Sequence, residues 1–118
     1  MNLLITGATG IAAATAKLAA QAGASVFIVS LNENDCTRLA NEIRATGAQA
    51  EFYAGDLVQE TTAIQSVQSC VQRFGRIDAL FNVAGISGRK FGDGPLHECS
   101  ETGWDVTMDT NAKTTFLM

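Results

Sequence analysis

Four short apolar runs, each followed by a longer segment of helical character, constrain the fold of this chain more than any other feature. The runs are NLLIT (residues 2–6), VFIV (26–29), AEFYA (50–54) and IDALFN (77–82). They contain β-branched and aromatic residues, which favour strands. Strands that alternate with helices form parallel sheets with helices on both faces, joined by right-handed crossovers. The sequence therefore predicts an α/β fold built on a doubly wound parallel sheet.

The spacing of apolar residues predicts a helix after each run. The first helix, over residues 11–21, should bury Ile11, Ala14, Leu18 and Ala22. The second helix, capped by Asn32 or Asn34, should bury Cys36, Leu39, Ala40 and Ile43. The third should bury Ile64, Val67, Val71 and Phe74. These helices should end near Gly23, Gly47 and Gly75, and a last helix should run from Ser100 to Met118 after a glycine-rich loop over residues 84 to about 98.

Composition limits the possible functions. With 8 Lys and Arg against 12 Asp and Glu, the net charge of −4 argues against a nucleic-acid partner. The 118 residues suffice for one domain, and none of their apolar runs is long enough for a membrane span. The N-terminus does not resemble a signal peptide, so we expect a cytoplasmic protein whose three cysteines are free thiols. Neither the cysteines nor His97 show metal-ligand spacing, so no metal site is expected.

The turn Thr6-Gly7-Ala8-Thr9-Gly10 between the first strand and the first helix is the strongest local signal of a binding site. Glycines there allow a tight turn and a close approach of the backbone to a pyrophosphate, which faces the free N–H groups of the helix start. The absence of a following Lys-Ser or Lys-Thr excludes a P-loop. A glycine-rich turn without a ligand is the alternative interpretation.

The end of the second strand leaves the cofactor preference open. An acidic residue at this place would bind the ribose 2′-OH of NAD, whereas an arginine would accommodate the 2′-phosphate of NADP. The residues found there are Ser30, Leu31 and Asn32. Either NAD or NADP is therefore compatible with this strand end.

Four separated motifs together resemble the short-chain dehydrogenase/reductase family. They are the glycine turn at residues 6–10, Asp56-Leu57 after the third strand, Asn82-Val83-Ala84-Gly85 after the fourth, and Asn111 behind Trp104-Asp105. The order and spacing of the motifs fit this family along essentially the whole chain. The resemblance implies a Rossmann-like fold and an NAD(P)-dependent oxidoreductase that transfers hydride between nicotinamide and an alcohol or carbonyl substrate.

The resemblance also implies a role for each matched residue. Asn111 corresponds to a catalytic residue that bends its helix and holds a water in a proton relay. Asp56 and Leu57 correspond to adenine contacts, and Ser30 and Leu31 to ribose contacts. The full set of implied cofactor-binding residues is Gly7, Thr9, Gly10, Ile11, Ser30, Leu31, Asp56, Leu57, Asn82, Ala84 and Gly85.

Three departures from the family pattern are evident in the chain. The glycine turn and Val83 differ from the ordinary single-domain branch, and the family's Ser and Tyr-x-x-x-Lys residues would fall beyond Met118. Residues 1–118 are thus expected to form an incomplete dinucleotide-binding domain, truncated after about four strands and inactive alone. The complete protein is expected to be a homo-oligomer, without a nucleic-acid or membrane partner. The alternative is a non-catalytic nucleotide-binding or scaffold protein.

Overall fold

The computed structural model describes residues 1–118 and contains one four-stranded parallel sheet. The strands are β1 (Asn2–Thr6), β2 (Ser25–Ser30), β3 (Ala50–Ala54) and β4 (Ala79–Asn82), in the order β3-β2-β1-β4. β1 lies between β2 and β4, with Leu4 opposite Phe27 on one side and Leu80 on the other. The crossover from β3 over to β4 reverses the direction in which strands are added, which confirms the predicted doubly wound topology.

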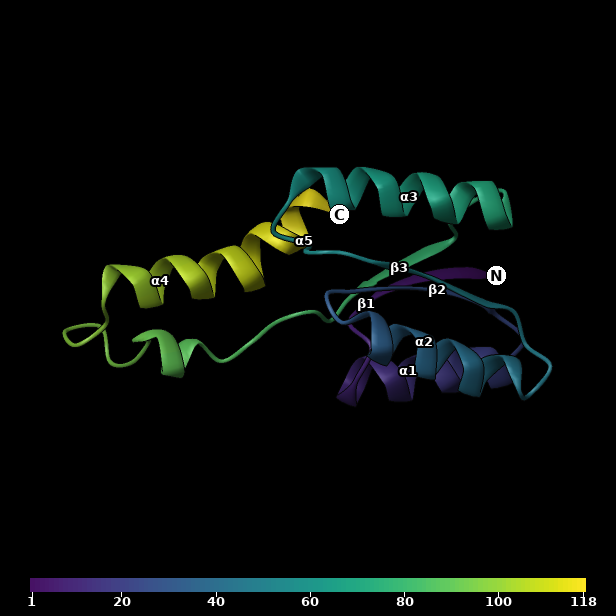
Figure 1. Ribbon diagram of the computed structural model, residues 1–118, viewed down its shortest axis with the longest axis horizontal. Helices are drawn as coiled ribbons and strands as arrows, with labels where there is room; N and C mark the ends of the chain where they lie inside the picture. Colours follow the sequence, from purple (N-terminus) through teal and green to yellow (C-terminus); the bar gives the residue numbers. More distant parts are fainter.

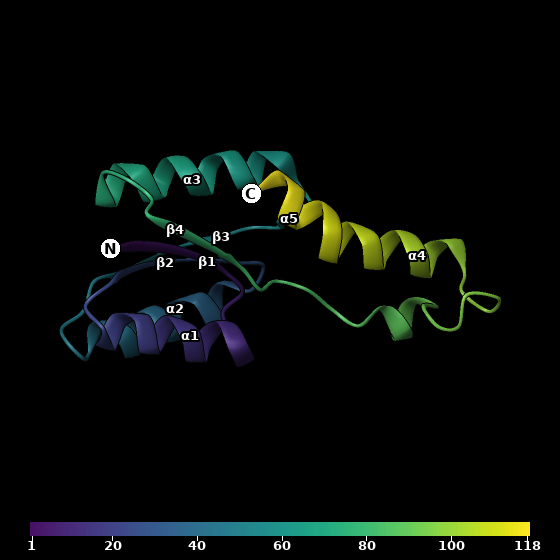
Figure 2. The same cartoon turned by 180° about the vertical axis from the view of Figure 1, so that it is seen from behind.

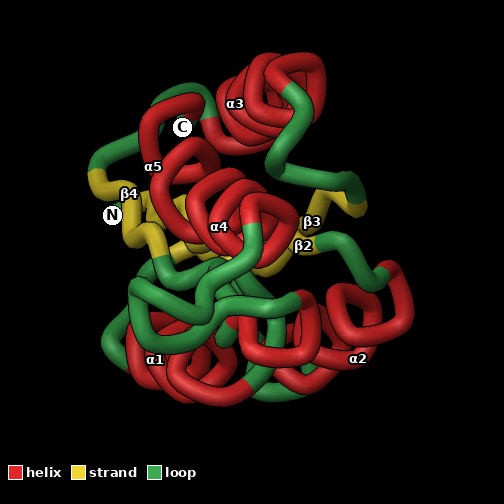
Figure 3. Tube along the Cα trace, turned by 90° about the vertical axis from the view of Figure 1, so that its left-hand side faces the viewer, coloured by secondary structure: helices red, strands yellow, loops and turns green.

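Helices cover both faces of the sheet. α1 (Gly10–Gln21) and α2 (Glu33–Arg44) lie on one face, and α3 (Glu60–Phe74) lies on the other (Figure 1). The view along the long axis of the molecule shows the three layers, with α5 (Thr114–Leu117) beside α3 (Figure 3). Each of the first three helices is followed within a few residues by a predicted glycine of positive φ, which ends the helix without steric cost.

The predicted buried face of α1 is wrong. Ile11 and Leu18 are 70% and 65% exposed, and Ala14 and Ala22 are also exposed. The helix instead buries Ala12, Ala16 and Ala20 against the sheet. Alanines let the helix axis approach the strands closely, so the small residues and not the bulky ones form the contact.

The face of α3 was only partly predicted. Val67 and Phe74 are half-buried and pack in the core beneath the helix, whereas Ile64 and Val71 are exposed. The fully buried residues of α3 are Thr62, Ala63, Ser66 and Cys70. By contrast, α2 buries the four predicted residues, and Asn32 rather than Asn34 caps it by accepting a hydrogen bond from the Asp35 N–H at 3.1 Å.

The segment after β4 extends away from the sheet (Figure 2). It contains a short 3-10 turn, η1 (Gly88–Phe91), within the predicted loop, and then α4 (Glu101–Met108), which Ser100 caps. The predicted last helix is interrupted by a π-helical turn over Asp109–Lys113 before α5 begins. Met118 returns to the body of the molecule and packs beside α3, where its sulfur meets the Ser66 hydroxyl.

None of these helices combines the length and the apolar character that crossing a membrane requires.

Candidate functional site

A cleft of about 660 Å³ lies at the carboxyl ends of the parallel strands. This is the edge at which ligands bind in open α/β sheets, because the strand order reverses there. Most of the predicted cofactor-binding residues line the cleft, namely Gly7, Thr9, Ile11, Ser30, Leu31, Asp56, Leu57, Ala84 and Gly85. Gly10, Asn82 and the predicted catalytic residue Asn111 do not line it.

The start of α1 at this cleft is not capped by the protein. Thr9 occupies the N-cap position in an extended conformation, but its side chain accepts no hydrogen bond from the helix. The first turn of α1 also contains no acidic residue, whereas the first turns of α2, α3 and α4 each contain at least one. The helix start therefore presents unpaired N–H groups and a partial positive charge to the cleft, which suits an anion such as a pyrophosphate.

The backbone of the glycine turn can lie close to a ligand because Gly7 and Gly10 carry no side chains. Gly7 has φ of +96°, and a Cβ on it would lie 3.1 Å from the Ala12 Cβ. Gly10, the first residue of α1, has φ of +53°. Both backbone conformations favour glycine over residues with side chains, so the turn remains free of side-chain bulk at the mouth of the cleft.

A buried hydroxyl joins the glycine turn to the end of β4. Thr6 is 2% exposed, and its Oγ1 accepts hydrogen bonds from the N–H groups of Val83 at 2.9 Å and Ala84 at 3.1 Å. The two loops that border the cleft are thereby fixed to one another. No motif predicted this positioning role for Thr6, although a threonine at a strand end, directly before the glycine turn, is the signal in the sequence that could have indicated it.

The opposite wall of the cleft is formed by the ends of β2 and β3. Ser30 is half-buried, while the Leu31 side chain is 72% exposed. Asp56 is exposed, and its Oδ1 accepts a hydrogen bond from the Val58 N–H at 3.1 Å, which orients the carboxylate. Leu57 is buried and anchors this turn in the core.

Asn111 is held behind the loop that follows β4. Its Nδ2 donates hydrogen bonds to the carbonyls of Thr107 at 2.8 Å and Ile86 at 3.0 Å, and its Oδ1 accepts one from the Ile86 N–H at 3.0 Å. A Cβ on Gly85 would collide with that Oδ1, so a side chain at this position would displace the Asn111 amide. Asn82, the last residue of β4, pairs with Thr6 across the sheet.

Several residues of the cleft wall were missed in the sequence. They are Ala8, Ala12, Val58, Val83, Ile86, Lys90, Phe91, Val106, Thr110 and Thr114. Lys90 is the one cation among the lining residues, and its ammonium lies 4.8 Å from the centroid of the Phe91 ring. Ala8, Ala12, Val58, Val83 and Ile86 lie beside predicted site residues in the turns that follow the strands or in α1. The other five come from η1, α4, the π turn and the start of α5, whose path around the cleft no motif in the sequence specified.

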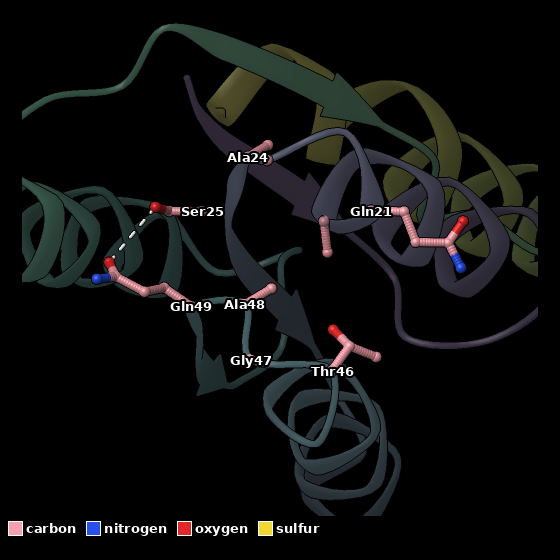
Figure 4. A pocket seen from close by; sticks show the side chains of 9 residues that line it. Gln21, Ala24, Ser25, Thr46, Gly47, Ala48 and Gln49 are labelled. Atoms are coloured by element: carbon pink, nitrogen blue, oxygen red, sulfur yellow. Dashed lines mark hydrogen bonds between the residues drawn. The ribbon is translucent and has the colours of Figure 1, made fainter.

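A second hollow of about 530 Å³ lies at the opposite edge of the sheet, where β2 begins (Figure 4). Its labelled side chains are small or carry amides and hydroxyls, and Ser25 and Gln49 hydrogen-bond across it at 3.4 Å. No ionisable side chain lines it. It lies at the amino end of β2, so the cleft at the carboxyl ends is the candidate functional site.

The fold and the cleft define an open α/β protein of the dinucleotide-binding kind. The comparison with known sequences is more specific, because residues 1–118 match the short chain dehydrogenase family along their entire length. This chain belongs to that family.

Individual relatives match over nearly all of this chain. It is 40% identical over 116 residues to the A-factor type gamma-butyrolactone 1′-reductase (1S-forming) of Streptomyces virginiae, which covers 96% of this chain and 43% of the relative. The chain shares 30% sequence identity with an NAD+-bound xylitol dehydrogenase of known crystal structure, and the two structures superpose with a TM-score of 0.90. The match covers 98% of this chain and 44% of the xylitol dehydrogenase chain. A metagenomic short-chain oxidoreductase in complex with NADP is 30% identical with a TM-score of 0.87, covering 99% and 52%. The chain thus spans about half the length, or less, of these proteins.

Proposed function

We propose that this chain forms the dinucleotide-binding part, over residues 1–118, of an NAD(P)-dependent oxidoreductase. The observation that carries the proposal is the start of α1, which is uncapped and free of acidic residues and lies in a cleft at the carboxyl end of β1. Membership of the short chain dehydrogenase family and the similarity to structures with bound NAD+ and NADP support it. The bound nicotinamide would supply or accept a hydride at an alcohol or carbonyl carbon of a small substrate.

The residues of the glycine turn would hold the pyrophosphate. Gly7 and Gly10 keep the turn open, and Thr9 and Ile11 flank the N–H groups that would donate to the phosphate oxygens. The first turn of α1 contains no carboxylate that would compete with a phosphate for these N–H donors. The binding therefore needs no cationic side chain at this point.

The two sides of the cleft would take the two halves of the dinucleotide. Ser30 and Leu31 would border the adenosine ribose, and Asp56 would accept a hydrogen bond from the adenine amino group, with Leu57 fixing the turn beneath it. On the other side, Ala84 and Gly85, in the loop that Asn82 at the end of β4 begins, would border the nicotinamide half. Small residues at this position let the backbone approach the ligand.

Asn111 would belong to the catalytic centre of the complete protein. Its amide is already oriented by Ile86 and Thr107, so it holds its place before a substrate arrives. The general acid and the group that polarises the substrate oxygen would come from Ser and Tyr-x-x-x-Lys residues, which residues 1–118 do not contain in the family pattern. We expect dinucleotide binding without turnover from this chain alone.

The exposed apolar residues at the β4 edge fit a role within a larger assembly. Leu80 and Phe81 are 41% and 39% exposed on β4, one of the two edge strands of the sheet. An unpaired apolar edge of this kind favours association with further strands. We propose a cytoplasmic homo-oligomer for the complete protein, with a small-molecule alcohol or carbonyl substrate and neither a nucleic-acid nor a membrane partner.

Isothermal titration calorimetry of this chain with NAD+ and NADP+ tests the proposal. We compare the wild type with Ile11→Glu, which places a carboxylate in the first turn of α1, and with Leu18→Glu as the matched control. Both side chains are largely exposed on the same helix, but only Ile11 lines the cleft. Dinucleotide affinity should fall about tenfold in Ile11→Glu and remain unchanged in Leu18→Glu. No binding of either dinucleotide to the wild type, or equal effects of the two variants, would contradict the proposal.

A further inference from the structure

We infer that the cleft takes a dinucleotide whose adenosine ribose carries no 2′-phosphate, so that NAD(H) is bound in preference to NADP(H). The inference rests on the proposed function and deepens it, because the sequence motifs alone leave the choice open. It depends on the charges around the end of β2, where the adenosine ribose would lie.

No cation is available at this end of the cleft. The residues that line it at the end of β2 are Ser30 and Leu31, a neutral hydroxyl and an exposed apolar side chain. Arg38 is the first basic residue after β2, and its guanidinium is paired with the Asp35 carboxylate at 2.8 Å. A 2′-phosphate carries about two negative charges and is normally held by an arginine, so it would lie here without a counter-charge.

The one cation of the cleft lies on the wrong side. Lys90 belongs to η1, which follows β4, and β1 separates β4 from β2 in the sheet. Two strand spacings, roughly 10 Å, separate the end of β4 from the end of β2. Lys90 is positioned toward the β4 side, where its ammonium lies over the Phe91 ring.

The nearest ionisable groups at the end of β2 repel a phosphate. Glu33 and Asp35 lie in the first turn of α2, directly after Leu31 and Asn32. The N-terminus of a helix attracts an anion, but in α2 the Glu33 carboxylate already supplies negative charge, Asp35 is paired with Arg38, and the Asn32 side chain caps the Asp35 N–H. An unphosphorylated ribose needs only hydrogen-bonding partners, and the Ser30 hydroxyl in the cleft wall is one.

Calorimetry with NAD+ and NADP+ on the same chain tests this inference. We expect NADP+ to bind at least about tenfold more weakly than NAD+, with the difference shrinking as salt screens the exposed carboxylates. Leu31→Arg should raise the affinity for NADP+ about tenfold relative to NAD+, because an arginine pairs with the phosphate bidentately. Leu18→Arg adds the same charge at an exposed leucine outside the cleft and should leave the ratio unchanged.

The outcomes separate the two proposals. If NADP+ binds as tightly as NAD+ or more tightly, the inference is overturned while the proposed function stands. If neither dinucleotide binds, the proposed function itself fails. A shift of the ratio by Leu18→Arg equal to that by Leu31→Arg would show that net charge, and not the end of β2, sets the preference.

Discussion

Replacing threonine by valine should have different effects at two positions of this protein whose hydroxyl oxygens are both buried. At Thr6 the hydroxyl accepts two backbone hydrogen bonds, from Val83 and Ala84, and joins the two loops that border the cleft. At Thr107 the hydroxyl oxygen is buried and has no hydrogen-bond partner. The two substitutions are chemically identical and nearly isosteric, so their difference measures the hydrogen bonds of Thr6.

The magnitude follows from the burial of each group. Leaving a buried N–H without an acceptor costs about 1–3 kcal/mol, and the half-buried Val83 and Ala84 retain some access to water. We therefore expect Thr6→Val to lower the free energy of unfolding by about 2 kcal/mol. Removing the unpaired hydroxyl in Thr107→Val should leave stability unchanged or raise it by about 1 kcal/mol.

Urea denaturation followed by circular dichroism measures both changes, provided that the dependence on urea concentration stays the same. Native-state hydrogen exchange adds a local readout, since the amides of Val83 and Ala84 should exchange faster in Thr6→Val and unchanged in Thr107→Val. Equal losses of stability in the two variants would refute the reasoning, as would unchanged protection of the two amides in Thr6→Val.

Three further predictions concern the loop after β4 and the cysteines. Gly85→Ala should cost about 1 kcal/mol, because the new methyl group displaces the Asn111 amide; in a double-mutant cycle with Asn111→Ala, the two losses should be less than additive. At neutral pH a thiol reagent should label Cys99 in the native protein but not the fully buried Cys36 and Cys70. All three cysteines should react in denaturant, and mass spectrometry counts the labels in each case. Burial raises the pKa of Cys36 and Cys70 from 9.0 to about 11, so the folded state holds these protons more tightly than the unfolded state. The free energy of unfolding should therefore fall as pH rises from 9 toward 11. In Cys36→Ala and Cys70→Ala variants, the contribution of the replaced thiol to this decrease should be absent.

The sheet could be predicted from the sequence, whereas helix faces could not be predicted reliably. The strands of a parallel sheet are buried on both faces, so they occur in the sequence as short, nearly continuous apolar runs rich in β-branched residues. Such runs are easily located in the sequence. In α1 the pattern of bulky residues indicated Ile11 and Leu18, but the helix packs through Ala12 and Ala16 because small residues permit the closest contact with the strands. A prediction based on the positions of bulky apolar residues cannot tell whether an alanine-rich helix face packs closely against the sheet or faces solvent.

The cleft was predictable for a topological reason. The turns after parallel strands meet at one edge of the sheet, so Gly7, Ser30, Asp56 and Ala84 come together although they are far apart in the chain. Lys90 and Phe91 reach the same cleft through η1, whose path depends on packing against α4 and not on a strand end. Contacts of that kind depend on the course of a loop and leave no periodic signal in the sequence.

The π-helical turn explains how a helix can hold the loop after β4. A π turn shifts backbone hydrogen bonds by one residue and changes the direction of the side chains it contains. In this turn the Asn111 amide donates to the Ile86 carbonyl and accepts from the Ile86 N–H, the same pairing that a neighbouring strand would provide. The loop residue Gly85 permits that approach because it has no side chain to collide with Asn111. The wall of the cleft beyond β4 is therefore fixed by one side chain from the distorted helix, and the glycine and the asparagine are required together.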